Sequence, residues 1–330
     1  MKVAILGNGG FGTAMAIALT RGEHRVSIWG HDKAYTEQVA RERHNPRYLD
    51  GIEVPESIAI GCDPEAVLEG ADVVLVAVPT QHIRSVLESM LPALGDQVPL
   101  VSLAKGLEQS TGKRPSQVIA ELLADDKRAL VLSGPSHAEE IARGQPTTVV
   151  LAGEDPAAVQ SLQEGLTTRE LRVYRNGDVR GTELGGALKN VMAIAAGIAE
   201  GLGYGDNAKA AILTRGIVEM ARYGVAEGAD ERTFFGLAGI GDLAVTAFSP
   251  HGRNRAFGAR IGGGMTLDEA LAASPKVAEG VWTSRVVAAR AQELAVEMPI
   301  ADAVCQVLFG GLAASDAVRG LMERDPKAEV

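Results

Sequence analysis

Residues 1–12 read MKVAILGNGGFG, and this stretch decides the fold of the first half of the chain. Val3 to Leu6 is a short apolar run, which predicts a buried strand. Gly7 to Gly12 fits the pattern GxGxxG and precedes a helical stretch, Thr13 to Thr20. In such a unit the first glycine permits a tight turn, the second lets the backbone approach a pyrophosphate, and the third allows close helix–strand packing. The alternative is a glycine turn that binds nothing. The candidate cofactor-binding residues here are Gly7, Gly9, Gly10, Phe11 and Gly12.

Strand-like and helix-like segments alternate as far as residue 180. Asp72 to Val78 is an almost continuous apolar run, as expected of a parallel strand covered by helices on both faces. From Thr182 onward the apolar spacing is almost entirely helical. We therefore predict an α/β fold, with a Rossmann-type, mainly parallel sheet in residues 1–181 and an all-helical domain in residues 182–330. Further strands are expected at Arg25–Trp29, Leu100–Leu103, Ala129–Ser133 and Thr147–Leu151, and helices at Ile83–Leu91 and Gln117–Leu123.

The composition indicates an acidic globular protein. The 330 residues carry a formal net charge of −10, whereas a nucleic-acid-binding surface would need a basic stripe. Cys62 and Cys305 lie far apart without metal-type spacing, so we expect two reduced thiols and no metal site. The apolar run before Gly7 is too short for a signal peptide, and no other run approaches the length of a membrane span. We expect a cytoplasmic protein without membrane insertion.

The end of the second predicted strand bears on the choice of cofactor. An acid at this position faces the ribose hydroxyl of NAD, and a cation accommodates the 2′-phosphate of NADP. The sequence Trp29-Gly30-His31-Asp32 places its acid late, and His31 with Arg41 or Arg43 could accept a phosphate. This combination favours NADPH, or the use of both cofactors.

Lys189 lies in a helical stretch with an unusual face. Leu184, Leu188, Val191, Met192 and Ala195 form an apolar stripe that belongs to the core. The neighbours of Lys189 on its own face are all small, so a ligand could approach its ammonium, and partial desolvation would lower its pKa toward the range of a proton donor. The alternative is an exposed lysine on a helix that merely packs tightly. These small neighbours are Gly185, Gly186, Ala193, Ala196 and Gly197.

Other candidate groups lie in short polar loops. Lys105 and Ser136 each follow a predicted strand, where open α/β sheets bind ligands. Arg253 and Asn254 lie in a turn that can form an anion site. Asp242 occupies a glycine-rich turn and could orient a lysine or cap a helix. For each loop taken alone, a solvated surface is the alternative interpretation.

Longer strings of sequence resemble one family throughout. They are GNGGFGTAMA from Gly7, SLAKGLE from Ser102, VLSGPSHAEEIARGQPT from Val131, ELGGALKNVMAIAAGIAEGLGYGDNAKAAILTRG from Glu183, TFFGLAGIGDL from Thr233, GRNRAFG from Gly252 and VAEGV from Val277. Together they resemble the bacterial NAD(P)-dependent sn-glycerol-3-phosphate dehydrogenase family, in order and from the first strand to about residue 285. The resemblance implies reduction of dihydroxyacetone phosphate to sn-glycerol 3-phosphate for phospholipid synthesis, with NADPH or NADH as the cofactor.

The resemblance also implies individual roles. Lys189 is expected to be the proton donor and acceptor, and Lys105 to polarise the substrate carbonyl. The substrate-binding residues are expected to be Lys105, Gly134, Ser136, Lys189, Asp242, Gly252, Arg253 and Asn254. Further cofactor contacts are expected from His31, Tyr48, Lys105, Ala138, Arg253, Val277 and Glu279.

One position departs from the family, because many relatives carry a serine where this chain has Gly252. The missing hydroxyl could change the affinity for phosphate without changing the reaction class. The main alternative function is another NAD(P)-dependent hydroxyacid dehydrogenase with a helical second domain, in which the Arg253 loop would clamp a carboxylate. A non-enzymatic NADP-binding sensor would need neither Lys105 nor Lys189. Helical second domains of this kind often pair, so a homodimer is possible.

Overall fold

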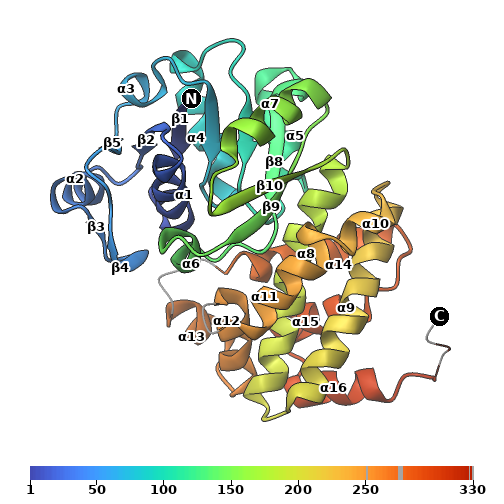
Figure 1. Cartoon of the computed structure of the whole chain (residues 1–330). Helices are drawn as coiled ribbons and strands as arrows, with labels where there is room; N and C mark the ends of the chain where they lie inside the picture. The colour runs from blue at the N-terminus through green and yellow to red at the C-terminus, as the bar shows by residue number, and fades with distance from the viewer. Residues whose placement is uncertain (250–251, 274–277, 327, 329–330) are drawn as a thin grey trace. The chain divides into compact units, whose positions relative to one another are not determined.

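The computed structural model describes residues 1–249, 252–273, 278–326 and 328. The chain forms two compact units, Met1–Glu183 and Leu184–Val330, which we call unit 1 and unit 2. Unit 1 contains a mainly parallel sheet with helices, and unit 2 is helical (Figure 1). The predicted fold class is therefore confirmed.

Unit 1 is organised around one eight-stranded sheet with the order β10-β9-β8-β7-β6-β1-β2-β5. Neighbouring strands are parallel except β8 and β9, which are antiparallel. The strands are β1 (Lys2–Leu6), β2 (Arg25–Trp29), β5 (Ala59–Gly61), β6 (Val73–Val76), β7 (Leu100–Ser102), β8 (Ala129–Ser133), β9 (Thr147–Ala152) and β10 (Leu171–Asn176), and the separate ribbon is formed by β3 (His44–Asn45) and β4 (Leu49–Glu53).

The sheet is buried on both faces, which explains why its central strands read as apolar runs. In β1, Val3 and Ile5 belong to a core that also contains Met15 of the following helix, whereas Ala4 and Leu6 belong to a second core. Successive residues of a strand point to opposite faces, so β1 separates these two cores. Strand β10 at the edge alternates buried Leu171 and Val173 with exposed residues, and our sequence analysis did not predict it.

The helices of unit 1 connect consecutive strands. They are α1 (Gly10–Arg21), α2 (Lys33–Glu42), α3 (Pro64–Leu68), α4 (Ile83–Met90), α5 (Pro115–Leu123), α6 (Ala138–Ala142) and α7 (Pro156–Leu166), with the short 3-10 helices η1 (Thr80–His82), η2 (Leu91–Ala93) and η3 (Asp126–Arg128). Helix α1 begins inside the GxGxxG turn, and Arg21 at its end donates hydrogen bonds to the carbonyl oxygens of Ile141 and Ala142. The glycine turn is thus held between β1 and a helix that is itself fixed.

The long helix α8 (Val179–Gly201) runs through the position at which we predicted the boundary between domains, residues 181 and 182. The polar stretch before it therefore ends at Asp178, and the domain assignment by sequence stays a prediction. Unit 2 continues with α9 (Asp206–Ala226), α10 (Glu231–Phe234), the π-helical turn η4 (Leu237–Gly241), α11 (Asp242–Phe248), α12 (Arg253–Gly262), α13 (Leu267–Ala272), α14 (Glu279–Glu293), α15 (Pro299–Phe309) and α16 (Ala314–Met322).

Helices α8 and α12 approach one another closely through glycines. A Cβ atom on Gly197 of α8 would overlap the carbonyl oxygen of Arg255, and one on Gly258 of α12 would overlap that of Ile194. The same holds four residues later on each helix, at Gly201 and Gly262. Backbone-to-backbone packing of this kind fixes the start of α12, with Arg253 and Asn254, relative to the helix that carries Lys189.

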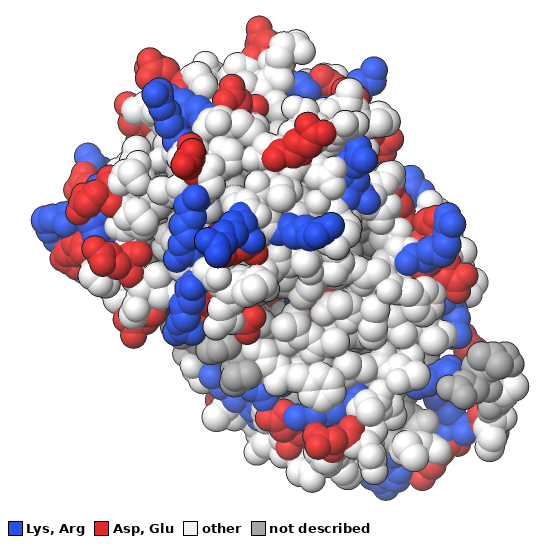
Figure 2. Space-filling model, in the orientation of Figure 1, with Lys and Arg blue, Asp and Glu red and all other residues white. Residues whose placement is uncertain are grey.

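The surface carries charges of both signs. On the face shown in Figure 2, basic side chains of unit 1 form a short row with acidic side chains on either side, and much of the surface over the helices of unit 2 is uncharged.

Among the described residues, no single helix is both long and apolar enough to cross a membrane. The bent pair Glu231–Phe248 and Arg253–Gly262 reaches the required length and composition only when the two helices are taken together.

Candidate active site

The glycine turn between β1 and α1 fits a bound pyrophosphate. Gly7 has φ +116°, and a Cβ atom there would lie 2.8 Å from the carbonyl oxygen of Ala77. A Cβ atom on Gly12 would overlap the carbonyl oxygen of Gly7, and one on Gly10 would lie 2.7 Å from that of Tyr48. Among the described residues other than its two chain neighbours, none has an atom within 4 Å of a Cβ atom on Gly9. The turn is therefore closed against the protein and open at Gly9, where the helix N-terminus can receive an anion.

A buried polar network supports this turn, and our sequence analysis did not find it. Asn45 donates to the carbonyl oxygen of Asn8 and to Thr13 Oγ1, both at 2.8 Å. Its own Oδ1 accepts from the hydroxyl of Tyr35 at 2.6 Å. The side chain of Asn8 donates to Thr36 Oγ1 at 3.0 Å. No spacing rule links these residues, because they come from different elements and meet only when the chain is folded.

The end of β2 carries the acid and the cations that bear on the choice of cofactor. Asp32 caps α2 by accepting from the Tyr35 amide, and this hydrogen bond, with the nearby Arg47, lowers the pKa of its carboxyl group. Arg47 lies 3.4 Å from Asp32 and stacks over the Tyr35 ring at 4.1 Å. His31 is exposed, whereas Arg43 is held by Glu56 and by the carbonyl oxygen of Ile58. Arg47 thus lies beside Asp32 near this strand end, and our sequence analysis did not name it.

Lys105, Gly134 and Ser136 lie together in unit 1. Lys105 Nζ donates to the carbonyl oxygen of Gly134 at 2.9 Å and to Ser136 Oγ at 3.1 Å. Gly134 has φ +124°, a backbone conformation that residues other than glycine rarely adopt. Phe11, from the glycine turn, has its ring centroid 5.9 Å from Lys105 Nζ. The predicted residues after β7 and β8 therefore form one cluster, and α6 begins two residues beyond it at Ala138.

Lys189, Asp242 and Thr246 form the corresponding cluster in unit 2. Lys189 Nζ donates to Asp242 Oδ1 at 2.9 Å and to Thr246 Oγ1 at 2.6 Å. The side chains of Lys189 and Asp242 are only 8% and 2% exposed, so this ion pair is buried. The carboxylate attracts the ammonium of Lys189, whereas burial of the side chain opposes its charge. Thr246 was absent from our predicted set, although it follows Asp242 by one helical turn.

The small residues beside Lys189 serve close packing. A Cβ atom on Gly185 would lie 2.6 Å from the carbonyl oxygen of Ala238, and Gly197 meets the backbone of α12. These two glycines therefore bring the backbones of η4 and α12 against α8. Since Asp242 directly follows η4, the contact at Gly185 brings the carboxylate within reach of Lys189.

The start of α12 is connected to the same helix. Asn254 Nδ2 donates to Oδ1 of Asn190, the residue after Lys189, at 2.8 Å, and Asn254 Oδ1 accepts from the Gly280 amide at 3.1 Å. Arg253 precedes it as the first residue of α12, and Glu279 is the first residue of α14. Val277 lies outside the described residues. Asn190 and Gly280 are further members of this cluster that the sequence did not reveal.

Gly252 also lies where the backbone leaves no room for a side chain. A Cβ atom at this position would lie 2.5 Å from the carbonyl oxygen of Thr246. The backbone at Gly252 thus approaches the helix that carries Asp242 and Thr246 more closely than a serine would allow. Among the described residues, no group of three or more His, Cys, Asp or Glu side chains could hold a metal ion.

Comparison with known proteins agrees with this geometry. The family described as "NAD-dependent glycerol-3-phosphate dehydrogenase" matches with its N-terminal part over residues 2–159 and with its C-terminal part over residues 178–319. The NAD(P)+ glycerol-3-phosphate dehydrogenases of Chlorobium limicola and Dechloromonas aromatica are each 45% identical, over the whole of both chains. The crystal structure of glycerol-3-phosphate dehydrogenase from Coxiella burnetii has a TM-score of 0.92 at 37% identity, covering 98% of this chain and 99% of that one.

The fold, the glycine turn and these relatives place the chain among the NAD(P)-dependent oxidoreductases. Within that class, it belongs to the NAD-dependent glycerol-3-phosphate dehydrogenase family. The family resemblance that we drew from sequence strings is thereby confirmed.

Proposed function

We propose that this protein reduces dihydroxyacetone phosphate to sn-glycerol 3-phosphate, reversibly, with NADPH or NADH. The observation that carries the proposal is the buried ion pair of Lys189 and Asp242, completed by Thr246, in a chain of this family. An ammonium fixed by a carboxylate and a hydroxyl can deliver a proton in a defined direction.

The chain's own residues account for the proton and the charge. A bound reduced nicotinamide supplies the hydride. Negative charge then develops on the C2 oxygen of the substrate, where the Lys105 ammonium stabilises it electrostatically and Lys189 Nζ delivers the proton. In the reverse direction Lys189 accepts that proton, while Asp242 compensates the charge and holds the side chain in place.

The phosphate of the substrate is assigned to Gly252, Arg253 and Asn254. A guanidinium can bind two phosphate oxygens at once, which adds orientation to affinity. Because the amide of Asn254 is held by Asn190 and Gly280, it presents a fixed geometry to the ligand. Gly134 and Ser136 are assigned to the substrate beside Lys105.

The cofactor is assigned to the glycine turn and to residues near it. NADPH is preferred in this proposal, because the Arg47 guanidinium beside the end of β2 can pair with a 2′-phosphate. The other proposed cofactor contacts are His31, Tyr48, Lys105, Ala138, Arg253, Val277 and Glu279. We further propose that the enzyme acts in the cytoplasm as a homodimer and supplies glycerol 3-phosphate for phospholipid synthesis.

One assay tests this function. The purified full chain is given dihydroxyacetone phosphate with NADPH and then with NADH, and the oxidation of the cofactor is followed by absorbance. We expect turnover with both cofactors and a higher kcat/KM with NADPH. Two-carbon and longer 2-ketoacids serve as competing substrates. Faster turnover of a ketoacid would favour a hydroxyacid dehydrogenase and contradict the proposal.

A further inference from the structure

The loop that carries Lys105 is fixed to the rest of unit 1 by hydrogen bonds from the side chains of Gln81 and Arg84. Residues 103–114 connect β7 to α5 and contain neither helix nor strand. We propose that Arg84 is a positioning residue for Lys105, acting through a clasp on the buried carboxylate of Glu108. The proposal rests on the proposed function, in which Lys105 stabilises charge on the substrate oxygen.

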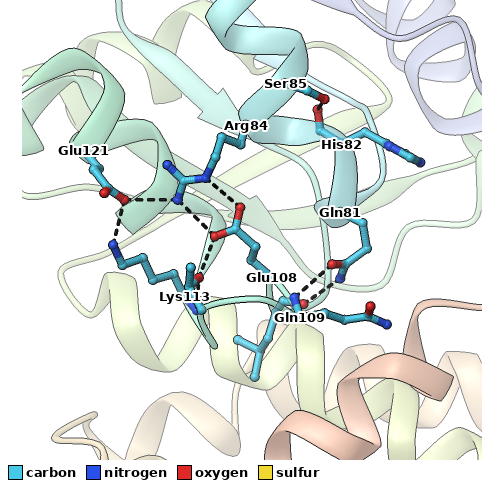
Figure 3. Close-up of polar contacts among 10 residues, drawn as sticks. Gln81, His82, Arg84, Ser85, Glu108, Gln109, Lys113 and Glu121 are labelled. Carbon is cyan, nitrogen blue, oxygen red and sulfur yellow. Dashed lines mark hydrogen bonds and ion pairs between the residues drawn. The ribbon is translucent and has the colours of Figure 1, made fainter.

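The centre of the clasp is a two-pronged ion pair (Figure 3). Arg84 Nε donates to Glu108 Oε1 at 2.9 Å, and Arg84 Nη2 donates to Glu108 Oε2 at 3.0 Å. Glu108 is only 5% exposed, and Thr111 Oγ1 donates to the same carboxylate at 2.5 Å. The hydrogen bonds from Arg84 are the main cause of a lowered pKa at Glu108, so the carboxylate is charged at neutral pH. A buried charge of this kind is expensive unless it is paired.

Backbone hydrogen bonds close residues 108–113 into a compact loop. The Glu108 amide donates to the carbonyl oxygen of Lys113 at 2.9 Å, and the Gly112 amide donates to the carbonyl oxygen of Glu108 at 2.8 Å. By holding the Glu108 carboxylate, Arg84 therefore fixes the whole loop and not only the Glu108 side chain. Lys105 lies three residues before this anchor.

Gln81 provides a second attachment on the Lys105 side of the loop (Figure 3). Its Nε2 donates to the carbonyl oxygen of Leu107 at 2.7 Å, and its Oε1 accepts from the Gln109 amide at 2.9 Å. The side-chain amide of Gln81 thus pairs with backbone groups on both sides of Glu108, the carbonyl of Leu107 and the N–H of Gln109. Gln81 and Arg84 lie in η1 and at the start of α4, so both attachments come from the connection after β6.

An outer ion pair gives a natural control. Arg84 Nη2 also lies 3.1 Å from Glu121 Oε2, and Lys113 Nζ lies 2.7 Å from the same atom. The side chain of Glu121 is 46% exposed, so water screens these contacts and their contribution is small. Removing the Glu121 charge leaves the fork between Arg84 and Glu108 intact.

The consequence for Lys105 follows from its contacts. Its ammonium is placed by Gly134 and Ser136 at one end and by the path of its own backbone at the other. Without the fork, Glu108 moves toward water to solvate its charge, and the loop moves with it. Displacement of a catalytic group by about 1 Å can cost up to about 100-fold in rate.

A double-mutant cycle tests the proposal. We expect Arg84→Met and Glu108→Gln each to lower kcat/KM for dihydroxyacetone phosphate by about 10- to 100-fold, and Glu121→Gln to leave it unchanged. If Arg84 acts through Lys105, the double variant Arg84→Met/Lys105→Ala is no worse than Lys105→Ala alone, within about twofold. Multiplied losses in the double variant would overturn the proposal. If Arg84→Met fails to fold, Arg84→Lys takes its place, since it keeps the charge but loses the fork.

A second measurement needs no turnover. The full-length protein is treated with acetic anhydride, and acetylation of Lys105 is measured by peptide mass spectrometry relative to the exposed Lys33. We expect Arg84→Met to raise the relative labelling of Lys105 several-fold, and equal labelling in wild type and variant would overturn the proposal. Wild-type protein that does not reduce dihydroxyacetone phosphate would refute the proposed function, and the labelling result would still decide whether Arg84 positions Lys105.

Discussion

The two lysine clusters differ in how they hold a positive charge. In unit 1, Lys105 is partly buried and meets two neutral oxygens, those of Gly134 and Ser136. In unit 2, Lys189 is almost fully buried and meets the carboxylate of Asp242. The carboxylate beside Lys189 fixes its ammonium and balances the charge while the lysine carries the proton. The difference matches the two proposed roles.

Two buried carboxylates, one in each unit, differ in the direction of their pKa shift. In unit 1, Glu108 is paired with Arg84, which lowers its pKa. In unit 2, Glu219 is 4% exposed and accepts from the amides of Ile300 and Ala301 at the start of α15. Burial raises the pKa of Glu219 to about 7. At Glu219 the effect of burial on the pKa exceeds that of the backbone hydrogen bonds, whereas at Glu108 the hydrogen bonds from Arg84 outweigh burial.

The largest expected effect separates the two lysines. Lys189→Ala should lower kcat by about 10²–10⁴-fold with little change in cofactor affinity, because it removes a positioned proton donor. Lys105→Ala should lower kcat and weaken cofactor binding together, because this lysine is assigned to both ligands. Steady-state kinetics and fluorescence titration with NADPH measure the two quantities. Full NADPH oxidation by Lys189→Ala would exclude Lys189 as the proton donor.

The second effect concerns stability. Asp242→Ala leaves the Lys189 ammonium buried without its carboxylate and should cost about 3–5 kcal/mol in the free energy of unfolding. Ser136→Ala removes one hydrogen bond of Lys105 and should cost about 1 kcal/mol. Urea denaturation of both variants gives the comparison. The double variant Lys189→Met/Asp242→Ala should recover part of the loss, and equal costs for the two single variants would show that the clusters do not differ.

The third effect is a pH dependence with opposite sign at Glu219 and Glu108. Glu219 keeps its proton in the folded state up to about pH 7, but in the unfolded state only up to its ordinary pKa of 4.5. The free energy of unfolding should therefore fall between these pH values, by about 3 kcal/mol at most, and change no further above them. Glu108, with its lowered pKa, instead contributes stability that is present above its ordinary pKa and is lost in acid.

Matched glutamine variants isolate these contributions. Glu219→Gln should reduce the decrease between pH 5 and pH 7.5, and Glu108→Gln should reduce the loss in acid, both measured by urea denaturation at several pH values. A Glu219→Gln variant with the same slope as wild type would show that this carboxylate titrates normally in the folded protein.

The smallest effect tests a cation outside both clusters. Arg253 is exposed at the start of α12, and Arg253→Ala should raise KM for dihydroxyacetone phosphate by about 10- to 100-fold, the equivalent of one charge-assisted contact. The value of kcat should change much less, since Arg253 takes no part in the proposed proton transfer. An unchanged KM would exclude this residue from the phosphate site.

The sequence alone predicted the features that depend on neighbours in the chain. The GxGxxG turn, the apolar strands and the helical second half are local patterns, and they gave the fold class and the family correctly. Strand β10 was not predicted because only one of its faces is buried. The start of α8 was not predicted because polar residues precede it. The predicted catalytic and substrate-binding residues lie in the cluster after β7 and β8, on α8 and at the starts of α11 and α12, but their roles stay proposals.

Tertiary structure decided which groups meet. Lys189 and Asp242 are separated by 53 residues, and they form an ion pair because glycines let the backbone of η4 approach α8. The network of Asn8, Asn45 and Tyr35 and the clasp on Glu108 likewise join elements that no periodicity connects. A hydrogen bond depends on distance and direction in space, and a sequence specifies these only through the complete set of contacts that packs one element against another.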